Sequence, residues 1–208
     1  MKATTKAVGP MPAEALEYFR RKKLEPDLDL EEAWEQEHGE AFRVAGVVAE
    51  DLLAGLRDAV DQALEQGLTY AEFKAGLDDV LKALGWLGEG DKVPRRLRVV
   101  YDTNMRVARA AGQWTRIQRT AEDRPYLTYG LGPAERHRPE HVAWAGTVLP
   151  VDDSWWSSHF PPNGYNCHCH VRQLSTAEAK RKGISSSAPG GAPDPGWDQN
   201  PGAAPRGS

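Results

Sequence analysis

Cysteine is scarce in this chain, since its 208 residues include only Cys167 and Cys169, with a single residue between them. A disulfide between such near neighbours would be strained and would remove little entropy from the unfolded chain. The sequence therefore excludes a fold stabilised by disulfides. It also lacks the run of about 18 apolar residues that a membrane-spanning helix needs, and its first residues hold no apolar core of the signal-peptide kind. We expect a protein that is made and folds in a cytoplasm and has no membrane partner.

The composition is that of a globular protein with a polar surface. Hydrophobic residues make up 40% and charged residues 27% of the chain, and the mean hydropathy is -0.61. The net charge of -4 is unevenly distributed, because residues 1–91 carry 20 acidic and 10 basic side chains and residues 92–208 carry 10 acidic and 16 basic ones. The two halves are therefore oppositely charged.

Apolar spacing and capping residues predict mostly helices before residue 120. Helices are expected over about 12–23, from Asp29, and over about 48–67, 69–84 and 95–120. Gly67 suits the end of one helix, and Thr69 with Glu72 has the spacing of a capping box at the start of the next.

Beyond residue 124 the pattern changes to strands and turns. The stretches "PYLTYGLG", "TVLPVDD" and "NCHCHVRQL" have the alternation of strands, and we expect the last two to pair with each other in a small antiparallel sheet. Pro139 opens a helical turn that Gly146 ends. From residue 183 the chain is rich in Gly, Pro and Ser, which predicts a tail that is mobile up to Pro195, with Trp197 as an anchor for the residues after it.

These patterns together predict an α+β fold, with a mainly helical N-terminal region, a small antiparallel β module and a flexible C-terminal tail. The corresponding domains are 1–91, 92–182 and 183–208. Five aromatic residues crowd into the region of the sheet and are expected to form its core: Trp144, Trp155, Trp156, Phe160 and Tyr165.

Four arginines of the long predicted helix lie within an arc of about 140° on helical geometry. They are Arg106, Arg109, Arg116 and Arg119. Such a stripe is typical of a solvated face with cations toward the helix C-terminus. Contact with nucleic acid or with an acidic partner is the alternative.

The two cysteines are the most informative chemical feature. In a strand, Cys167 and Cys169 would face the same side, where two thiolates could supply half of a tetrahedral zinc shell. His141 is the first choice for the third ligand, because it lies on the short turn after Pro139, and His137 and His159 compete for the fourth position. A structural zinc site is one interpretation of the pair. Two inert, buried cysteines and a redox pair are the others.

The sequence gives little support for catalysis. No acidic cluster that could hold a catalytic cation accompanies the histidines, and Asp152 with Asp153 is explained more simply as a turn. Nor is there an activated nucleophile with an orienting third group. We predict that the protein is not an enzyme; a metal-dependent hydrolase or nuclease that uses the His/Cys cluster is the main alternative, and a DNA-binding module that uses the arginine stripe is another.

The order of several motifs carries a resemblance. "YDTNMRVARAAGQ", "RPYLTYGLG", "RPEHVAWAG", "VLPVDDSWWSSHFPPNGYNCHCHVRQLS" and "GWDQNPG" occur in that order along the chain. Together they resemble the phage Mu F-like head morphogenesis family, also called minor head proteins. The family's motif positions fall on Arg138, His141, Gly146, Pro161, Pro162, Gly164, Asn166, Cys167 and Cys169. One position departs from the family, because His168 stands where arginine is usual.

The resemblance implies a structural protein of a phage or prophage head rather than a catalyst. It would be present in few copies, act in procapsid assembly near the portal, and lie in the head interior of the virion after synthesis in the host cytoplasm. Its implied partners are the portal and other head proteins, with contact to packaged DNA as a further expectation. In this context, we interpret His141, Cys167 and Cys169 as a metal site or a structural polar cluster.

Overall fold

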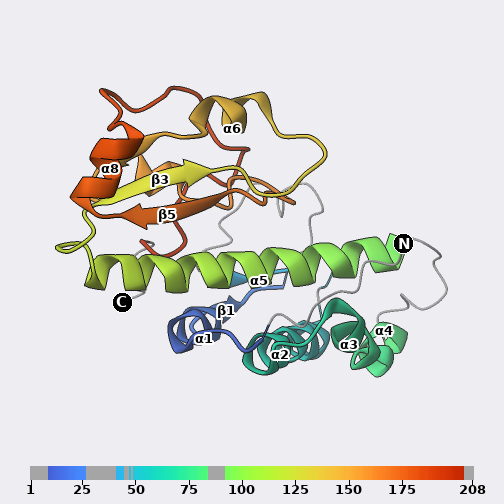
Figure 1. Ribbon diagram of the computed structural model, residues 1–208. Helices are drawn as coiled ribbons and strands as arrows, with labels where there is room; N and C mark the ends of the chain where they lie inside the picture. The colour runs from blue at the N-terminus through green and yellow to red at the C-terminus, as the bar shows by residue number, and fades with distance from the viewer. Residues whose placement is uncertain (1–8, 27–40, 45–46, 48, 84–91, 204–208) are drawn as a thin grey trace. The chain divides into compact units, whose positions relative to one another are not determined.

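A computed structural model of the chain describes residues 9–26, 41–44, 47, 49–83 and 92–203 (Figure 1). The helix expected from Asp29 and the last five residues of the chain lie outside these ranges. The fold is α+β, as predicted, with helices before residue 120 and a three-stranded antiparallel sheet after it. The chain divides into two compact units, Met1–Arg109 and Ala110–Ser208. The division into 1–91, 92–182 and 183–208 stays a prediction.

The unit Met1–Arg109 consists mainly of short helices. Its elements are α1 (Ala13–Arg20), β1 (Lys23–Leu24), β2 (Ala41–Phe42), α2 (Glu50–Gln66), α3 (Tyr70–Ala75), α4 (Asp78–Ala83) and the first part of α5 (Lys92–Arg119). The two short strands pair in parallel. Phe19 packs edge-on against Phe42, and Leu56, Leu64 and Leu81 are buried. Aliphatic and phenylalanine side chains therefore make up most of this core.

The helix ends in this unit obey local sequence rules. Gly67 ends α2 in the left-handed conformation, with a φ of 69°. The Thr69 side chain accepts a hydrogen bond from the Glu72 N–H, and the Glu72 carboxylate accepts one from the Thr69 N–H, so the predicted capping box is confirmed. The helix expected to reach residue 84 is divided, because α3 ends at Ala75, with Gly76 as its C-cap, and α4 begins at Asp78. Glycine is a poor helix former, which favours a break at this point.

The unit Ala110–Ser208 is built around the sheet. It holds the rest of α5, β3 (Tyr126–Gly130), α6 (Pro139–Trp144), β4 (Val148–Pro150), α7 (Trp156–His159), β5 (His170–Leu174) and α8 (Thr176–Lys182). The strand order is β4-β3-β5, and both neighbours of β3 run antiparallel to it; Figure 1 draws β3 beside β5. The expected pairing of "TVLPVDD" with "NCHCHVRQL" is therefore wrong. Three successive residues in the middle of β3 are buried, which suits a central strand covered on both faces.

The crowded aromatic residues form the core of this unit, as predicted. Trp144, Trp156 and Phe160 have no exposed surface, and Trp155 is buried. Tyr165 is partly exposed and instead packs edge-on against Trp197. Ring contacts between these residues are mostly edge-to-face, the arrangement that aromatic quadrupoles favour.

The segment after α8 differs from the flexible tail that its composition predicts. The ring N–H groups of Trp155 and Trp144 donate hydrogen bonds to the carbonyl oxygens of Pro189 and Gly190, at 3.1 and 2.9 Å. Tryptophan N–H groups at the edge of the aromatic core thus find their acceptors in a stretch that has no helix or strand of its own. The prediction of a tail that is mobile up to Pro195 is therefore corrected, because Pro189 and Gly190 are held against the aromatic core.

The same segment is fixed again further along. Trp197 is only 4% exposed, which confirms it as an anchor. The Asn200 side chain donates to the Trp156 carbonyl oxygen, and the Asn200 backbone N–H donates to the Ser157 carbonyl oxygen. We refer to residues 189–203 as the C-terminal strap, since they close over the aromatic core at two separate points.

Candidate metal centre

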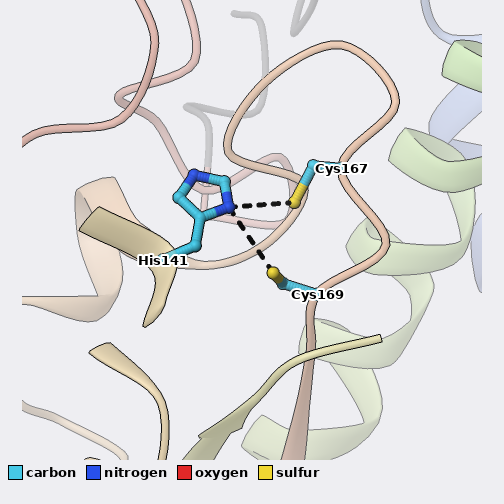
Figure 2. Close-up of side chains that lie close together, drawn as sticks. All are labelled: His141, Cys167 and Cys169. Carbon is cyan, nitrogen blue, oxygen red and sulfur yellow. Dashed lines mark hydrogen bonds between the residues drawn. The ribbon is translucent and has the colours of Figure 1, made fainter. Parts of the chain in front are cut away.

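Three side chains from two distant segments meet beside the sheet. His141 lies on α6, and Cys167 and Cys169 lie in the loop that leads into β5. Nδ1 of His141 is 3.8 Å from Sγ of Cys167 and 3.5 Å from Sγ of Cys169. The three donor atoms lie within 4.8 Å of one another, and Figure 2 shows both sulfur atoms facing the same ring nitrogen. His141 and Cys167 are buried, and Cys169 is partly buried.

These distances match those of ligands around one zinc ion. With Zn–S bonds of about 2.3 Å and Zn–N bonds of about 2.0 Å, tetrahedral geometry places sulfur and nitrogen ligand atoms about 3.5 Å apart. The observed separations of 3.5 and 3.8 Å fit that value. Two thiolates and an imidazole are also a donor set that zinc prefers. The residues present therefore fit a zinc ion.

Hydrogen bonding alone gives a poorer account of the arrangement. Nδ1 of a histidine carries either one hydrogen or one lone pair, so it can make one good hydrogen bond in the ring plane. Here two sulfur atoms approach the same nitrogen. A cation between them would satisfy all three atoms at once.

The cysteines lie in a loop rather than in the strand predicted for them. β5 begins only at His170, so the strand position of Cys167 and Cys169 is wrong. The loop turns through Asn166, which has a φ of 57°, and the Cys167 N–H donates to the Gly164 carbonyl oxygen. Asparagine tolerates this left-handed conformation better than most residues. The turn brings both sulfur atoms to one side, the outcome that strand alternation predicted for another reason.

The two thiols differ in acidity. The pKa of Cys169 is lowered to about 6, because the Cys167 thiol donates a hydrogen bond to its sulfur, with smaller contributions from the Tyr129 hydroxyl and the Gly132 N–H; burial opposes the change. The pKa of Cys167 is raised, because its thiol is the donor in that hydrogen bond and is buried. The cluster therefore already favours one thiolate at neutral pH, and thiolate is the form that binds a metal.

Arg138, at the N-terminus of α6, ties the cluster to the C-terminal strap. Its guanidinium forms an ion pair with Asp194 at 2.5 Å and donates a hydrogen bond to the Tyr165 carbonyl oxygen at 3.2 Å. Gly164 leaves room for this pair, since a Cβ there would clash with the Asp194 carboxylate and lie 2.9 Å from Arg138 Nη2. The contacts are those of a residue that holds the loop and the strap in place.

A small pocket opens over the three donors. Its lining includes Arg136, His137, Arg138 and His168, and it contains no Asp or Glu among the residues that the structure describes. His137 thus lies at the pocket, although its ring is not part of the three-residue group.

His159, the other candidate for the fourth position, has a different role. Its Nδ1 lies 2.7 Å from the Ser158 hydroxyl, its Nε2 lies 3.2 Å from the Gly191 carbonyl oxygen, and its ring stacks on Trp155. Burial lowers the pKa of His159, which favours the neutral ring. These contacts make His159 a support for the C-terminal strap.

The remaining motif residues shape the backbone around the cluster. Gly146 has a φ of 85° just after α6, and its N–H donates to the Tyr129 carbonyl oxygen. Pro161 and Pro162 are buried and joined by a cis peptide bond. Asn163, which the sequence did not single out, is fully buried and accepts a hydrogen bond from the Tyr129 hydroxyl at 3.0 Å. Its place directly after the proline pair was the signal that could have identified it.

The arginines of the predicted stripe differ in environment. Arg109 and Arg119 are exposed, whereas Arg106 and Arg116 are partly buried. Arg106 also lies 3.9 Å from Asp102 on its own helix. The four side chains are therefore not equally exposed to solvent.

Comparisons with known proteins agree with the resemblance. The sequence model of a family described as "Phage Mu protein F like protein" matches residues 54–172. The chain is 37% identical over 189 residues to the putative capsid assembly protein F of Escherichia phage Mu, which covers 85% of this chain and 43% of that protein. It is 32% identical over 169 residues to the Mu-like prophage FluMu F protein of Haemophilus influenzae, covering 77% of this chain and 41% of that protein. The chain therefore spans less than half the length of these two relatives.

No solved structure matches it. Within the described residues, no helix has the length and apolar character to cross a membrane.

Proposed function

This chain belongs to the phage Mu protein F-like family, and from that premise we propose that it is a structural component of a phage or prophage head that acts in head assembly. The observation that carries the proposal is its 37% identity, over 85% of its length, to a protein named as a putative capsid assembly protein. The family match at residues 54–172 includes parts of both compact units. The proposed role therefore concerns the folded chain rather than one motif.

The proposal has a more specific part. The protein acts during procapsid assembly near the portal, associates with the portal and other head proteins, remains in the head interior of the virion, and contacts packaged DNA. Exposed arginines on α5, Arg109 and Arg119, support the DNA contact, because phosphate binding relies on accessible cations. Retention on immobilised DNA that falls steeply with added salt would agree with this contact, and retention indifferent to salt would count against it.

The proposed role is structural rather than catalytic. A hydrolytic zinc site needs a general base, commonly a carboxylate, beside the metal-bound water. The lining of the pocket over His141 contains no such group in the described part of the chain.

Association with heads is the direct test of the assembly role. A tagged form of the chain would be expressed together with the head proteins of the phage or prophage that carries its gene, and the heads would be separated by gradient centrifugation. The tagged chain is expected to sediment with the heads. Trp144→Ala, which opens a cavity in the core, is the control that shows whether sedimentation with the heads requires the intact fold. A folded wild-type chain that stays at the top of the gradient would contradict the proposal.

The His/Cys cluster is proposed to bind one zinc ion as a structural clasp. His141, Cys167 and Cys169 would hold the ion, and zinc bound there would join α6 to the loop before β5. The match of donor distances to tetrahedral zinc supports this assignment. A bound metal also explains why two cysteines share one histidine nitrogen.

Metal analysis tests the clasp. Elemental analysis of the purified protein is expected to find about one zinc per chain. His141→Ala and Cys167→Ser should each lose the metal and thermal stability, whereas the exposed neighbour His170→Ala should keep both. Metal-free protein with variants as stable as the wild type would contradict the clasp and leave the cysteines as packing residues.

A further inference from the structure

We propose that the fourth position of this metal is left open to the pocket and takes a carboxylate from an aspartate or glutamate side chain of another protein. This inference rests on the proposed zinc clasp and goes beyond it, because it makes the clasp a docking point. The ligand would displace a water molecule from the metal, and no covalent bond of the protein would be broken.

The geometry of the donors points to three protein ligands. In the part of the chain that the structure describes, the group able to hold a metal comprises His141, Cys167 and Cys169. Both sulfur atoms already lie at ligand separation from Nδ1 of His141, and the three donor atoms lie within 4.8 Å of one another. His159 is engaged with Gly191 and Ser158, and His137 lies at the pocket without joining the group.

The backbone next to His137 is held in place. Arg138 is the next residue and is fixed by the ion pair to Asp194 and the hydrogen bond to the Tyr165 carbonyl oxygen. α6 begins one residue later, at Pro139. His137 would therefore have to reach the metal by side-chain rotation from a fixed backbone, whereas a ligand from outside meets an open pocket.

The charges around the pocket favour an anionic ligand. A zinc ion with two thiolates and a neutral imidazole has no net charge. Arg136 and Arg138 then add two positive charges at the pocket, and Asp194 offsets one of them. A carboxylate would complete the tetrahedron and pair with the exposed guanidinium of Arg136. It is also a common oxygen ligand of zinc.

Cobalt substitution tests the open position. Protein loaded with Co²⁺ in place of zinc shows visible d–d bands whose intensity and position report coordination number and ligands. We would titrate acetate, as the carboxylate probe, into the cobalt form of the wild type and of His137→Ala. Dimethyl phosphate, which resembles the nucleic-acid backbone, would be titrated in parallel.

Acetate is expected to shift the bands with saturation in both proteins, and dimethyl phosphate is expected to leave them unchanged. Arg136→Ala should keep its cobalt and bind acetate roughly two- to fivefold more weakly, the effect of losing one exposed charge contact. Bands that ignore acetate in the wild type but change in His137→Ala would show that His137 closes the site, which overturns the inference. A response to dimethyl phosphate alone would overturn the choice of a carboxylate. A protein that binds no cobalt would overturn the zinc clasp itself, whereas unresponsive bands overturn only the open position.

Discussion

Buried side chains in the unit Met1–Arg109 are mostly aliphatic, and leucines of α2 and α4 are prominent among them. In the unit Ala110–Ser208, the largest fully buried side chains are Trp144, Trp156 and Tyr129. Aliphatic cores tolerate exchange between residues of similar volume. Tryptophan and tyrosine carry a polar group that needs a partner when buried, so each also fixes a position in the backbone around it.

The second unit uses those polar groups to hold its loops. The indole N–H groups of Trp144, Trp155 and Trp156 each donate to a backbone carbonyl oxygen, those of Gly190, Pro189 and Pro150 respectively. These contacts hold residues 189–190 and the end of β4 against the aromatic core. In Ala110–Ser208, buried tryptophans therefore combine packing with a specific hydrogen bond, and the motifs from Arg138 to Cys169 lie in the same unit.

Removal of the proposed zinc ion should produce the largest difference in stability between the two units. Structural zinc contributes on the order of 10 kcal/mol to small metal-dependent folds, so chelation should unfold much of Ala110–Ser208. Five of the seven tryptophans lie in that unit. We therefore expect near-UV circular dichroism to collapse on chelation, while most of the far-UV helical signal remains. Near-UV spectra unchanged by a strong chelator would remove the proposed difference between the units.

A cavity made in the core of one unit should lower the stability mainly of that unit. Trp144→Ala is expected to cost about 3–5 kcal/mol and Leu56→Ala about 2–5 kcal/mol of unfolding free energy. Hydrogen exchange can assign each loss to a unit, because protection should fall mainly in the unit that carries the substitution. The comparison breaks if Leu56→Ala lowers protection across β3 and β5 as much as across α2.

The C-terminal strap offers a smaller and more specific effect. The buried Asn200 side chain donates to the Trp156 carbonyl oxygen and accepts from the Gly202 N–H. Asn200→Ala should cost about 1–3 kcal/mol, because buried backbone groups lose their partners. Trp197 should then become accessible to a soluble quencher. The exposed neighbour Asp198→Ala is the matched control, and equal quenching in both variants would contradict an anchored strap.

Capping boxes provide a like-for-like test, since each unit has one. Thr69 caps α3 and Ser175 caps α8, each with a glutamate three residues later. Thr69→Ala and Ser175→Ala should each cost about 1 kcal/mol. Denaturant unfolding monitored by hydrogen exchange in each unit would measure both losses. A cost several times larger at Ser175 alone would show that α8 supports more of its unit than a capped helix end does.

The smallest expected effect concerns pH. Burial lowers the pKa of His159, so the folded protein keeps this ring neutral where the unfolded chain, with a pKa of about 6.5, begins to bind a proton. The unfolding free energy should therefore fall as the pH drops below that value. His159→Gln should make the stability of Ala110–Ser208 less dependent on pH between about pH 7 and pH 5. Identical pH profiles for the two proteins would contradict a buried, neutral His159.

Features set by neighbouring residues could be predicted from the sequence. The capping box at Thr69, the helix end at Gly67 and the long helix α5 depend on local spacing, and the structure contains all three. The meeting of His141 with the two cysteines was also predicted, because a cysteine pair can supply half of a zinc shell and His141 lies on the short turn after Pro139. The order of the motifs, through the family resemblance, supported this grouping of residues that lie far apart in the sequence.

Features set by distant partners could not be predicted. The central place of β3 depends on pairing with strands about 20 and 45 residues further along the chain. Docking of the strap depends on Trp144 and Trp155 finding carbonyl oxygens more than 30 residues away, which composition does not encode. Arg138 could be identified as a motif residue, but its partner Asp194 lies in a segment that looked like a tail.

The ring of His141 stacks on Trp144, with ring centroids 4.9 Å apart and planes 23° from parallel. Indole emission is sensitive to the electronic state of a stacked imidazole, and a cation bound at Nδ1 changes that state. The fluorescence of Trp144 should therefore respond when the proposed zinc ion binds, which would make Trp144 an internal optical probe of that site.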